Sequence, residues 1–329
     1  MTVEGVHLLE QLQTPALMVS RGQVRFANSA AKTLLGAHIV GQDVRIAIRD
    51  PKAVAAILSD SGGLAQVSGL STGGSVWEVD CRVLGPNDRL VSLYDLSERV
   101  SVAKSHADFV ANASHELRTP LANVLGYVET LMNPKAGGDE TVRNRFLETI
   151  RHEAQRMQAL ISDLMSLSRI EAIKHEVPLD NVELVALVHD VAGEFRRSAQ
   201  VAVTANCTRA VIAGDRGQLS QVLRNLIDNA LKYGKPGGPV EVSVEAARTG
   251  WVLITVRDEG EGIPPEHLPR ITERFYRADT SRSRAAGGTG LGLSIVKHIV
   301  ERHRGRFDIE SRLGAGTTAS LMLPLRDES

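Results

Sequence analysis

Two long segments in the middle of the chain carry apolar residues at helical spacing, and they constrain the fold more than any other feature. In the first, from about 100 to 131, apolar residues recur every three or four positions. A breaker run at 133–138 ends it, and the second segment repeats the pattern from about 142 to 170. Two amphipathic helices joined by a short loop form an antiparallel hairpin, which covers only part of each apolar stripe. We therefore expect a second copy of the chain to complete a four-helix bundle as a homodimer.

Mixed patterns of strands and helices flank the hairpin on both sides. Before it, alternating segments at 16–19 and 76–83 predict strands, and 29–35 is typical of a helix. After it, 240–244 and 251–256 predict further strands among helical runs. The sequence therefore predicts an α+β multidomain chain, with domains at 1–98, 99–175 and 176–329.

Composition and charge exclude several classes of protein. The chain has 329 residues, of which 43% are hydrophobic and 23% charged, and its net charge of −1 provides no overall field for nucleic acid or an anionic membrane. Its start lacks the pattern of a signal peptide, and no run of about 18 apolar residues predicts a membrane span. Cys81 and Cys207 are too few for a disulfide framework. These features predict a cytoplasmic location and no membrane span.

The first motif that could carry chemistry is His115-Glu116-Leu117-Arg118-Thr119-Pro120, in the first predicted helix. His115 and Thr119 share a helical face, whereas Glu116 lies about 100° away. A zinc-protease helix needs a second histidine where Thr119 stands, so a metal site of that kind is not favoured. Pro120 costs roughly 3 kcal/mol inside a helix, which is unexpected beside an ordinary histidine. At this point a functional histidine and a solvated one both remain open.

Amide and carboxylate groups mark two further motifs. Asn225 and Asn229 share one face of a predicted helix with Lys232 close by, and amide oxygens suit Mg²⁺ while lysine suits phosphate. Asp258 ends an apolar strand just before a glycine turn, where a buried carboxylate can accept a hydrogen bond from the amino group of adenine. Taken alone, backbone-bonded asparagines and a plain Asp-Gly turn explain the same residues.

A glycine-rich loop at 287–292 precedes a predicted helix, so bare amides and a helix N-terminus can meet phosphate oxygens. The loop fits neither the dinucleotide fingerprint nor the P-loop. Upstream, 271–277 leads into a polar, basic stretch at 281–284 that we expect to close over phosphates. Downstream, Gly314-Ala315-Gly316-Thr317 precedes the last apolar strand. Together the separated motifs indicate a nucleotide site.

These motifs, in this order, resemble those of the sensor histidine kinases of bacterial two-component systems, from about residue 99 to the end. The segment at His115 resembles the phosphoacceptor box of that family, and the later motifs resemble its N, G1, F, G2 and G3 boxes. The resemblance implies that 99–175 is a dimerisation and histidine phosphotransfer domain. It also implies that 176–329 is a GHKL, or Bergerat, α/β sandwich that binds ATP, as in gyrase, Hsp90 and MutL. Asn225 stands where ATP-hydrolysing relatives carry a glutamate, as expected of an enzyme that phosphorylates histidine instead.

The resemblance also implies roles for individual residues. His115 accepts the γ-phosphate, Glu116 orients or deprotonates its ring, and Asn229 holds Mg²⁺. The phosphoryl group then passes to an aspartate in the receiver domain of a response regulator, and Thr119 serves in removing it again. The other implied ATP-binding residues are Asn225, Lys232, Tyr233, Asp258, Gly260, Gly262, Ile263, Phe275, Arg277, Gly288, Thr289, Gly290, Leu291, Gly292 and Thr317.

Residues 1–98 resemble a PAS sensory domain, with its characteristic patterns at 15–19, 27–36 and 94–99. The segments before His115 and at 271–277 are most similar to the PhoR subgroup, which implies an input related to phosphate, although the usual membrane anchor of that subgroup is missing from this sequence. The ligand of the PAS-like domain is not indicated. The alternative function is a nucleotide-binding relay protein that docks a response regulator without net kinase activity.

Overall fold

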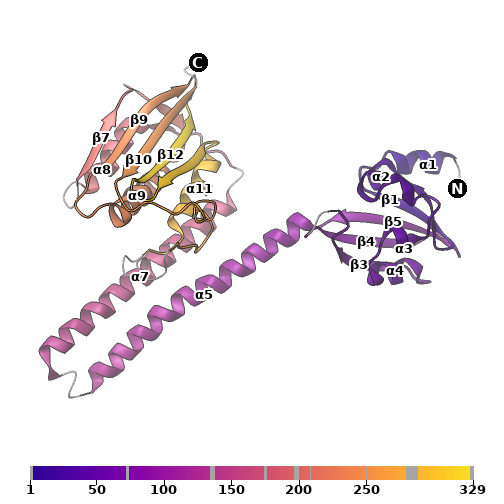
Figure 1. The fold of residues 1–329 in the computed structure, drawn as a ribbon, viewed down its shortest axis with the longest axis horizontal. Helices are drawn as coiled ribbons and strands as arrows, with labels where there is room; N and C mark the ends of the chain where they lie inside the picture. The colour runs from indigo at the N-terminus through magenta and orange to yellow at the C-terminus, as the bar shows by residue number, and fades with distance from the viewer. Residues whose placement is uncertain are drawn as a thin grey trace. The chain divides into compact units, whose positions relative to one another are not determined.

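The computed structural model divides the chain into two compact units, residues 1–110 and 111–329, each of which is described by itself (Figure 1). The structure describes residues 3–71, 74–133, 138–173, 176–195, 200–207, 209–248, 250–278 and 288–326.

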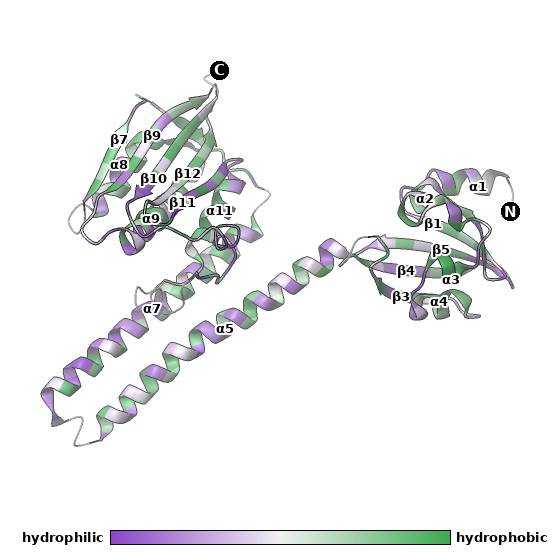
Figure 2. Cartoon of the chain, in the orientation of Figure 1, coloured by the Kyte–Doolittle hydropathy of each residue, from purple (hydrophilic) through white to green (hydrophobic). Residues whose placement is uncertain are grey.

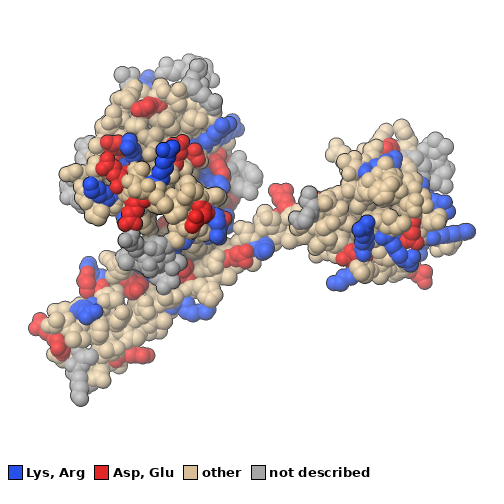
Figure 3. Space-filling model, viewed as in Figure 1, with Lys and Arg blue, Asp and Glu red and all other residues tan. Residues whose placement is uncertain are grey.

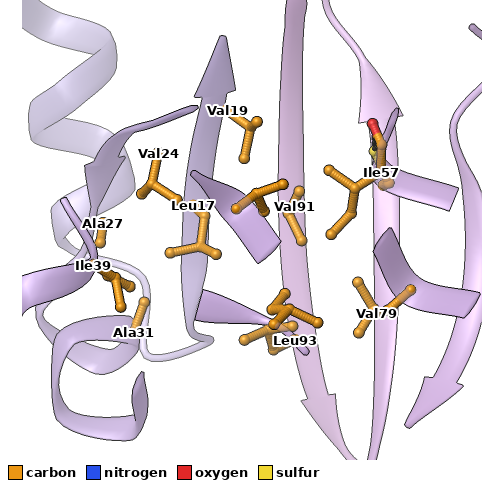
Figure 4. Close-up of a cluster of buried hydrophobic side chains, with 14 of the residues drawn as sticks. Leu17, Val19, Val24, Ala27, Ala31, Ile39, Ile57, Val79, Val91 and Leu93 are labelled. Atoms are coloured by element: carbon orange, nitrogen blue, oxygen red, sulfur yellow. Dashed lines mark hydrogen bonds between the residues drawn. The ribbon is translucent and has the colours of Figure 1, made fainter. Parts of the chain in front are cut away.

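The first unit is built on a five-stranded antiparallel sheet with the strand order β2-β1-β5-β4-β3. Leu17 and Val91 from the sheet pack with Ile39 and Ile57 from the helical segments, and all four side chains are fully buried (Figure 4). The predicted strands at 16–19 and 76–83 and the helix at 29–35 are confirmed. The elements are α1 Val3–Glu10, β1 Ala16–Ser20, β2 Gln23–Ala27, α2 Ser29–Leu35, η1 Ala37–Ile39, α3 Val44–Ala47, α4 Pro51–Leu58, β3 Gly63–Ser68, β4 Val76–Val83 and β5 Asp88–Asp95.

The predicted hairpin is confirmed as helices α5, Ser97–Met132, and α7, Glu140–Ala172. The two helices are antiparallel in the second unit, because Glu116 bonds Arg156 while the ring of Tyr127 contacts that of Phe146. Helix α5 continues through Pro120, whose side chain is buried. Apolar residues recur along both helices (Figure 2). Several of them remain exposed, namely Leu121, Leu125, Val128, Leu147, Ile161 and Met165.

The rest of the second unit is an α/β sandwich, here called the C-terminal module and defined as residues 180–326. Its five-stranded sheet has the order β11-β12-β10-β9-β7, in which only the β7–β9 pair is parallel. Alternating residues of β10, such as Val252 and Ile254, are buried against helices that supply Leu187, Leu223 and Val300. The elements are β6 Asn181–Glu183, α8 Leu184–Phe195, β7 Val201–Ala205, β8 Val211–Ala213, α9 Arg216–Tyr233, β9 Val240–Arg248, β10 Trp251–Asp258, α11 Gly292–Arg302, β11 Arg306–Arg312 and β12 Gly316–Pro324.

Helix α7 packs against helix α11 of this module, and its residues Leu167 and Ile170 are buried. Lys and Arg lie interspersed with Asp and Glu on the visible face of the module (Figure 3). None of the helices in the described part of the chain combines the length and the hydropathy that a membrane span requires.

Candidate functional site

Helices α9 and α11 lie antiparallel and are joined by a hydrogen bond near each end of α11. At the start of α11, the Nδ2 group of Asn225 donates to the carbonyl oxygen of Gly292 at 3.2 Å. At its end, Nε2 of His303 accepts from the backbone N–H of Asp215 at 3.0 Å, which requires the other ring nitrogen to donate to the carbonyl of Ile299 at 2.7 Å. Burial lowers the pKa of His303 and keeps the ring neutral. The loop that precedes α11 is thereby fixed beside the middle of α9.

The other α9 residues that the sequence singled out follow Asn225 on the same helix. Asn229 lies one turn later and is half-buried. Lys232 forms an ion pair with Asp228 at 2.6 Å between Nζ and Oδ2, and Tyr233 is largely exposed at the helix end. The predicted phosphate-seeking lysine is therefore already partnered by a carboxylate one turn earlier.

Asp258 occupies the last position of β10 and is only 7% exposed. Burial raises the pKa of this carboxyl group, and hydrogen bonds from the backbone N–H groups of Gly260 and Thr317 act in the opposite direction. The bond from Gly260 to Oδ1 measures 2.8 Å. In the sheet Thr317 is the register partner of Asp258 on β12. The strand pairing thus brings the predicted Asp258 and Thr317 together.

The turn after Asp258 is shaped by close backbone approaches. A Cβ atom at Gly260 would lie 2.2 Å from the carbonyl oxygen of Tyr233, so the turn touches the end of α9. Gly262 has a φ of +76°, and a Cβ there would lie 2.1 Å from the carbonyl oxygen of Arg312. Just beyond, the backbone N–H of Ile263 donates to Oγ of Ser311 at 2.8 Å, and that hydroxyl is 2.9 Å from Oγ1 of Thr317.

The glycine loop is described from Gly288 onward. Gly290 has a φ of +73°, and its carbonyl oxygen accepts from the backbone N–H of Phe275 at 2.8 Å. Phe275 itself has a φ of +63°, which is unusual for a residue with a side chain. Arg277 is half-buried two positions later. Leu291 donates its backbone N–H to Oγ1 of Thr289 at 3.3 Å. Gly287 and the basic stretch at 281–284 lie outside the described residues.

One contact of the glycine loop was not predicted from the sequence. The hydroxyl of Thr289 donates to Oδ2 of Asp163 on helix α7 at 2.7 Å. Burial raises the pKa of Asp163, while the bond from Thr289 and the charge of Lys232 lower it, and the charge of Asp228 adds a smaller increase. The signal in the sequence that could have pointed to this contact is Asp163 itself, an acidic residue between Ile161 and Leu164 of the apolar stripe of the second helix.

His115 lines a cleft of about 330 Å³ between α5 and the module. One wall is formed by Asn112, His115 and Glu116 of α5, and the other by residues 270 and 273–276 of the module. The carboxylate of Glu116 is 3.2 Å from Nη2 of Arg156, so it is held by α7. The hydroxyl of Thr119 donates to the carbonyl oxygen of His115 at 3.3 Å. The exposed imidazole of His115 therefore shares one cleft with the segment that carries Phe275.

Comparison with known families and proteins gives matches in both parts of the second unit. Residues 105–173 match the model "His Kinase A (phospho-acceptor) domain", and 214–327 match "Histidine kinase-, DNA gyrase B-, and HSP90-like ATPase". Sensor protein SrrB of Staphylococcus aureus strain N315 is 34% identical over 244 residues, which are 73% of this chain and 42% of SrrB. The chain thus spans less than half the length of the curated relatives it matches.

Two solved structures resemble the chain over larger fractions of their own length. The Acinetobacter baumannii histidine kinase AdeS is 25% identical with a TM-score of 0.50, and the match covers 65% of this chain and 98% of AdeS. Histidine kinase ThkA, crystallised in complex with response regulator protein TrrA, is 18% identical with a TM-score of 0.57. That match covers 97% of this chain and 98% of ThkA, and at this identity it supports the fold alone.

Proposed function

This chain belongs to the sensor histidine kinases, and from that premise we propose that it transfers the γ-phosphoryl group of ATP to His115 and then to an aspartate of a response regulator. The observation that carries the proposal is the position of His115 in the same cleft as the segment of Phe275, which bonds the glycine loop through Gly290. The acceptor and the loop suited to phosphates are thus on neighbouring elements of one unit.

The donor groups at the nucleotide site fit ATP. The buried Asp258 carboxylate can accept a hydrogen bond from the exocyclic amine of adenine, and the turn at Gly260 and Gly262 lets the backbone approach closely. Phosphate contacts are assigned to the glycine loop with Lys232 and Arg277. The remaining members of the proposed site are Asn225, Tyr233, Ile263, Phe275, Gly288, Thr289, Gly290, Leu291, Gly292 and Thr317.

Magnesium fits this donor set only together with the phosphates. Among the described residues, no group of three or more His, Cys, Asp or Glu side chains could hold a metal ion. Mg²⁺ usually keeps several waters and binds one or two protein oxygens, most often of carboxylates, plus substrate phosphates. In this site the amide oxygen of Asn229 would be the protein ligand. When bound, the ion would neutralise charge on the phosphate oxygens.

For the transfer itself, the protein supplies mainly position and charge. A ring nitrogen of His115 attacks the γ-phosphorus in line, the bond from that phosphorus to the β–γ bridging oxygen breaks, and ADP leaves. The loose transition state requires little covalent help. Glu116, which follows His115 in the sequence of α5, is the candidate that orients or deprotonates the ring. Its ion pair with Arg156 holds the carboxylate in place. Asn225 lacks the carboxylate that would activate water, which favours transfer to histidine over hydrolysis.

Partners and inputs are also part of this proposal. The exposed apolar residues of α5 and α7 support a homodimer through a four-helix bundle, on which a response regulator would dock. The antiparallel sheet and buried core of the first unit support a PAS-like sensory domain over 1–98, followed by the phosphotransfer domain at 99–175 and the catalytic domain at 176–329. A phosphate-related input and a regulator phosphatase activity that uses Thr119 complete it.

The decisive experiment is incubation of the purified chain with γ-labelled ATP and Mg²⁺. We expect a labelled phosphoryl group that is labile in acid and stable in base, as a phosphohistidine is. Nucleotide binding without any label would favour the alternative, a relay protein that docks a response regulator without net kinase activity.

A further inference from the structure

Helix α7 contacts the C-terminal module through a row of polar bonds over its last three turns. Asp163 accepts from Thr289, and the hydroxyl of Ser166 donates to Oε1 of Gln221 at 2.8 Å. Glu171 forms an ion pair with Arg274 and lies 3.8 Å from Nε2 of His298. Farther on, the guanidinium group of Arg302 donates to the carbonyl oxygen of Ile173 at 3.3 Å. We call these contacts the α7 latch.

Asp163 differs from the other residues of the α7 latch because it lies at the proposed phosphate site. Its partner Thr289 belongs to the glycine loop, and its carboxylate lies close enough to Lys232 and Asp228 for their charges to act on its pKa. Lys232 is the nearby cation assigned to phosphate, and it is already paired with Asp228. The carboxylate of Asp163 therefore lies, partly desolvated, where anionic phosphates are expected to bind.

We propose that Asp163 is an autoinhibitory anion, which weakens the binding of nucleotide phosphates for as long as the α7 latch holds the C-terminal module. A carboxylate and a phosphate repel each other, and the repulsion is strong where water is excluded. Asp163 also occupies the hydroxyl of Thr289 as a hydrogen-bond acceptor. Full affinity for ATP then requires the module to leave α7. This inference rests on the proposed function, since it assumes that the glycine loop binds ATP.

The effect must be reciprocal. If the closed α7 latch lowers the affinity for ATP by some factor, ATP lowers the stability of the closed latch by the same factor. A signal that opens the hairpin–module contact would raise ATP affinity without any change in the nucleotide site itself. Repulsion between charges also predicts that the effect is larger for ATP than for ADP, because ATP carries more negative charge.

The test compares Asp163→Asn with wild type in the full-length chain. Asparagine has the same shape, and its amide oxygen still accepts from Thr289, so the substitution removes the charge and keeps the contact. We expect ATP to bind roughly five-fold tighter or more in isothermal titration calorimetry, which is the lower end of common coupling strengths. The gain for ADP should be smaller, and both gains should decrease at high salt.

The matched control is Glu148→Gln, which removes one negative charge from the same helix. Glu148 is exposed and pairs with Arg151. It lies in the first half of α7, whereas the α7 latch is formed by the last three turns of that helix. We expect it to leave ATP affinity unchanged. A second variant, Glu171→Gln, weakens the α7 latch without touching the glycine loop and should also raise ATP affinity. Weakening the α7 latch raises affinity by moving the charge of Asp163 away from the phosphate site, so it should add little once that charge has been removed. The double variant should therefore gain less than the sum of the two free-energy changes.

Unchanged or weaker ATP binding by Asp163→Asn would overturn the inference, and weaker binding only with Mg²⁺ would make Asp163 a metal ligand instead. Equal gains for ADP and ATP would also overturn it. Absence of ATP binding by the wild type is a different result, because it contradicts the proposed function itself. Thermal unfolding of each variant, compared with wild type, establishes that the changes in affinity arise in a folded chain.

Discussion

His115 and Asp258 are both assigned to the same proposed reaction, yet their surroundings are opposite. His115 is exposed on a helix, where its own ring supports no other part of the fold that the structure describes. Asp258 is 7% exposed, ends a central strand, and accepts hydrogen bonds from a turn and from the neighbouring strand. On α5 the chemistry is separable from the fold, whereas in the C-terminal module the same residues serve both.

The largest expected effect concerns His115, the exposed residue of this pair. His115→Ala should abolish phosphorylation of the chain completely, because the acceptor nitrogen is lost. ATP affinity and the unfolding midpoint should stay near wild type, since an exposed side chain contributes little to stability. Radiolabel transfer, calorimetry and thermal unfolding measure the three quantities. Residual label on the variant would contradict the assignment of the acceptor.

The next effect tests the module, where a turn required for binding is also required for folding. Gly262→Ala would place a Cβ 2.1 Å from the carbonyl oxygen of Arg312 at a φ of +76°. We expect a loss of roughly 2–4 kcal/mol in unfolding free energy, from backbone strain plus the steric contact, with weaker ATP binding in parallel. Urea unfolding measures it.

The control for this substitution is Gly237→Ala, which has a similar φ of +72° but no described atom within 4 Å of the added Cβ. It should lose only about 1 kcal/mol, the typical penalty for alanine at positive φ. Equal losses of unfolding free energy in the two variants would mean that the close approach of Arg312 to the turn adds nothing to the cost of the substitution.

The sequence predicted the hairpin well because its signal is local. Apolar periodicity over about 100–131 and 142–170 became α5 and α7, longer by only a few residues at each end. Edge strand β3 was not predicted, since only Val67 within it is buried and its alternation is therefore weak. The nucleotide motifs were recognised by order and spacing. The contact between Asp163 and Thr289 could not be predicted from the sequence, because it joins residues 126 positions apart through the packing of α7 on α11.

Asp258→Asn removes the charge of the proposed adenine-binding side chain and keeps its shape. Burial raises the pKa of Asp258 in the folded state, so the stability contributed by its protonated form is present at low pH and is lost as the pH rises through that raised pKa. A neutral asparagine should therefore leave stability at neutral pH equal or slightly higher. With the amide oxygen of asparagine kept on the backbone N–H groups, its NH2 group would face adenine where the second carboxylate oxygen had been an acceptor. ATP binding should therefore weaken by roughly ten-fold, the equivalent of about 1.4 kcal/mol for one good hydrogen bond. Unchanged affinity in calorimetry would place adenine elsewhere.

The buried His303 gives the stability of the module a pH dependence. Burial lowers the pKa of His303 in the folded state below the ordinary value of 6.5. Its contribution to stability is present above 6.5 and is lost as the pH falls toward the folded-state pKa, because the unfolded chain binds the proton first. Unfolding free energies measured from pH 7.5 to 5 should therefore decrease. The decrease should be smaller in His303→Gln, and equal slopes would exclude His303 as the cause.

The smallest expected effect returns to α5 and concerns Thr119. Its hydroxyl lies one turn after His115 and bonds the carbonyl oxygen of His115 at 3.3 Å, a contact common for helical threonines. Because Thr119 is exposed, Thr119→Ala should change stability by only about 0.5 kcal/mol, and in the favourable direction of higher helix propensity. Phosphorylation of His115 needs no hydroxyl there and should stay at the wild-type rate. If the hydroxyl also positions a water in line with a docked aspartyl phosphate, the variant should prolong the lifetime of the phosphorylated regulator several-fold. Equal lifetimes with wild type and variant would assign Thr119 to the helix contact alone, and the regulator phosphatase part of the proposal would fail while the kinase part stands.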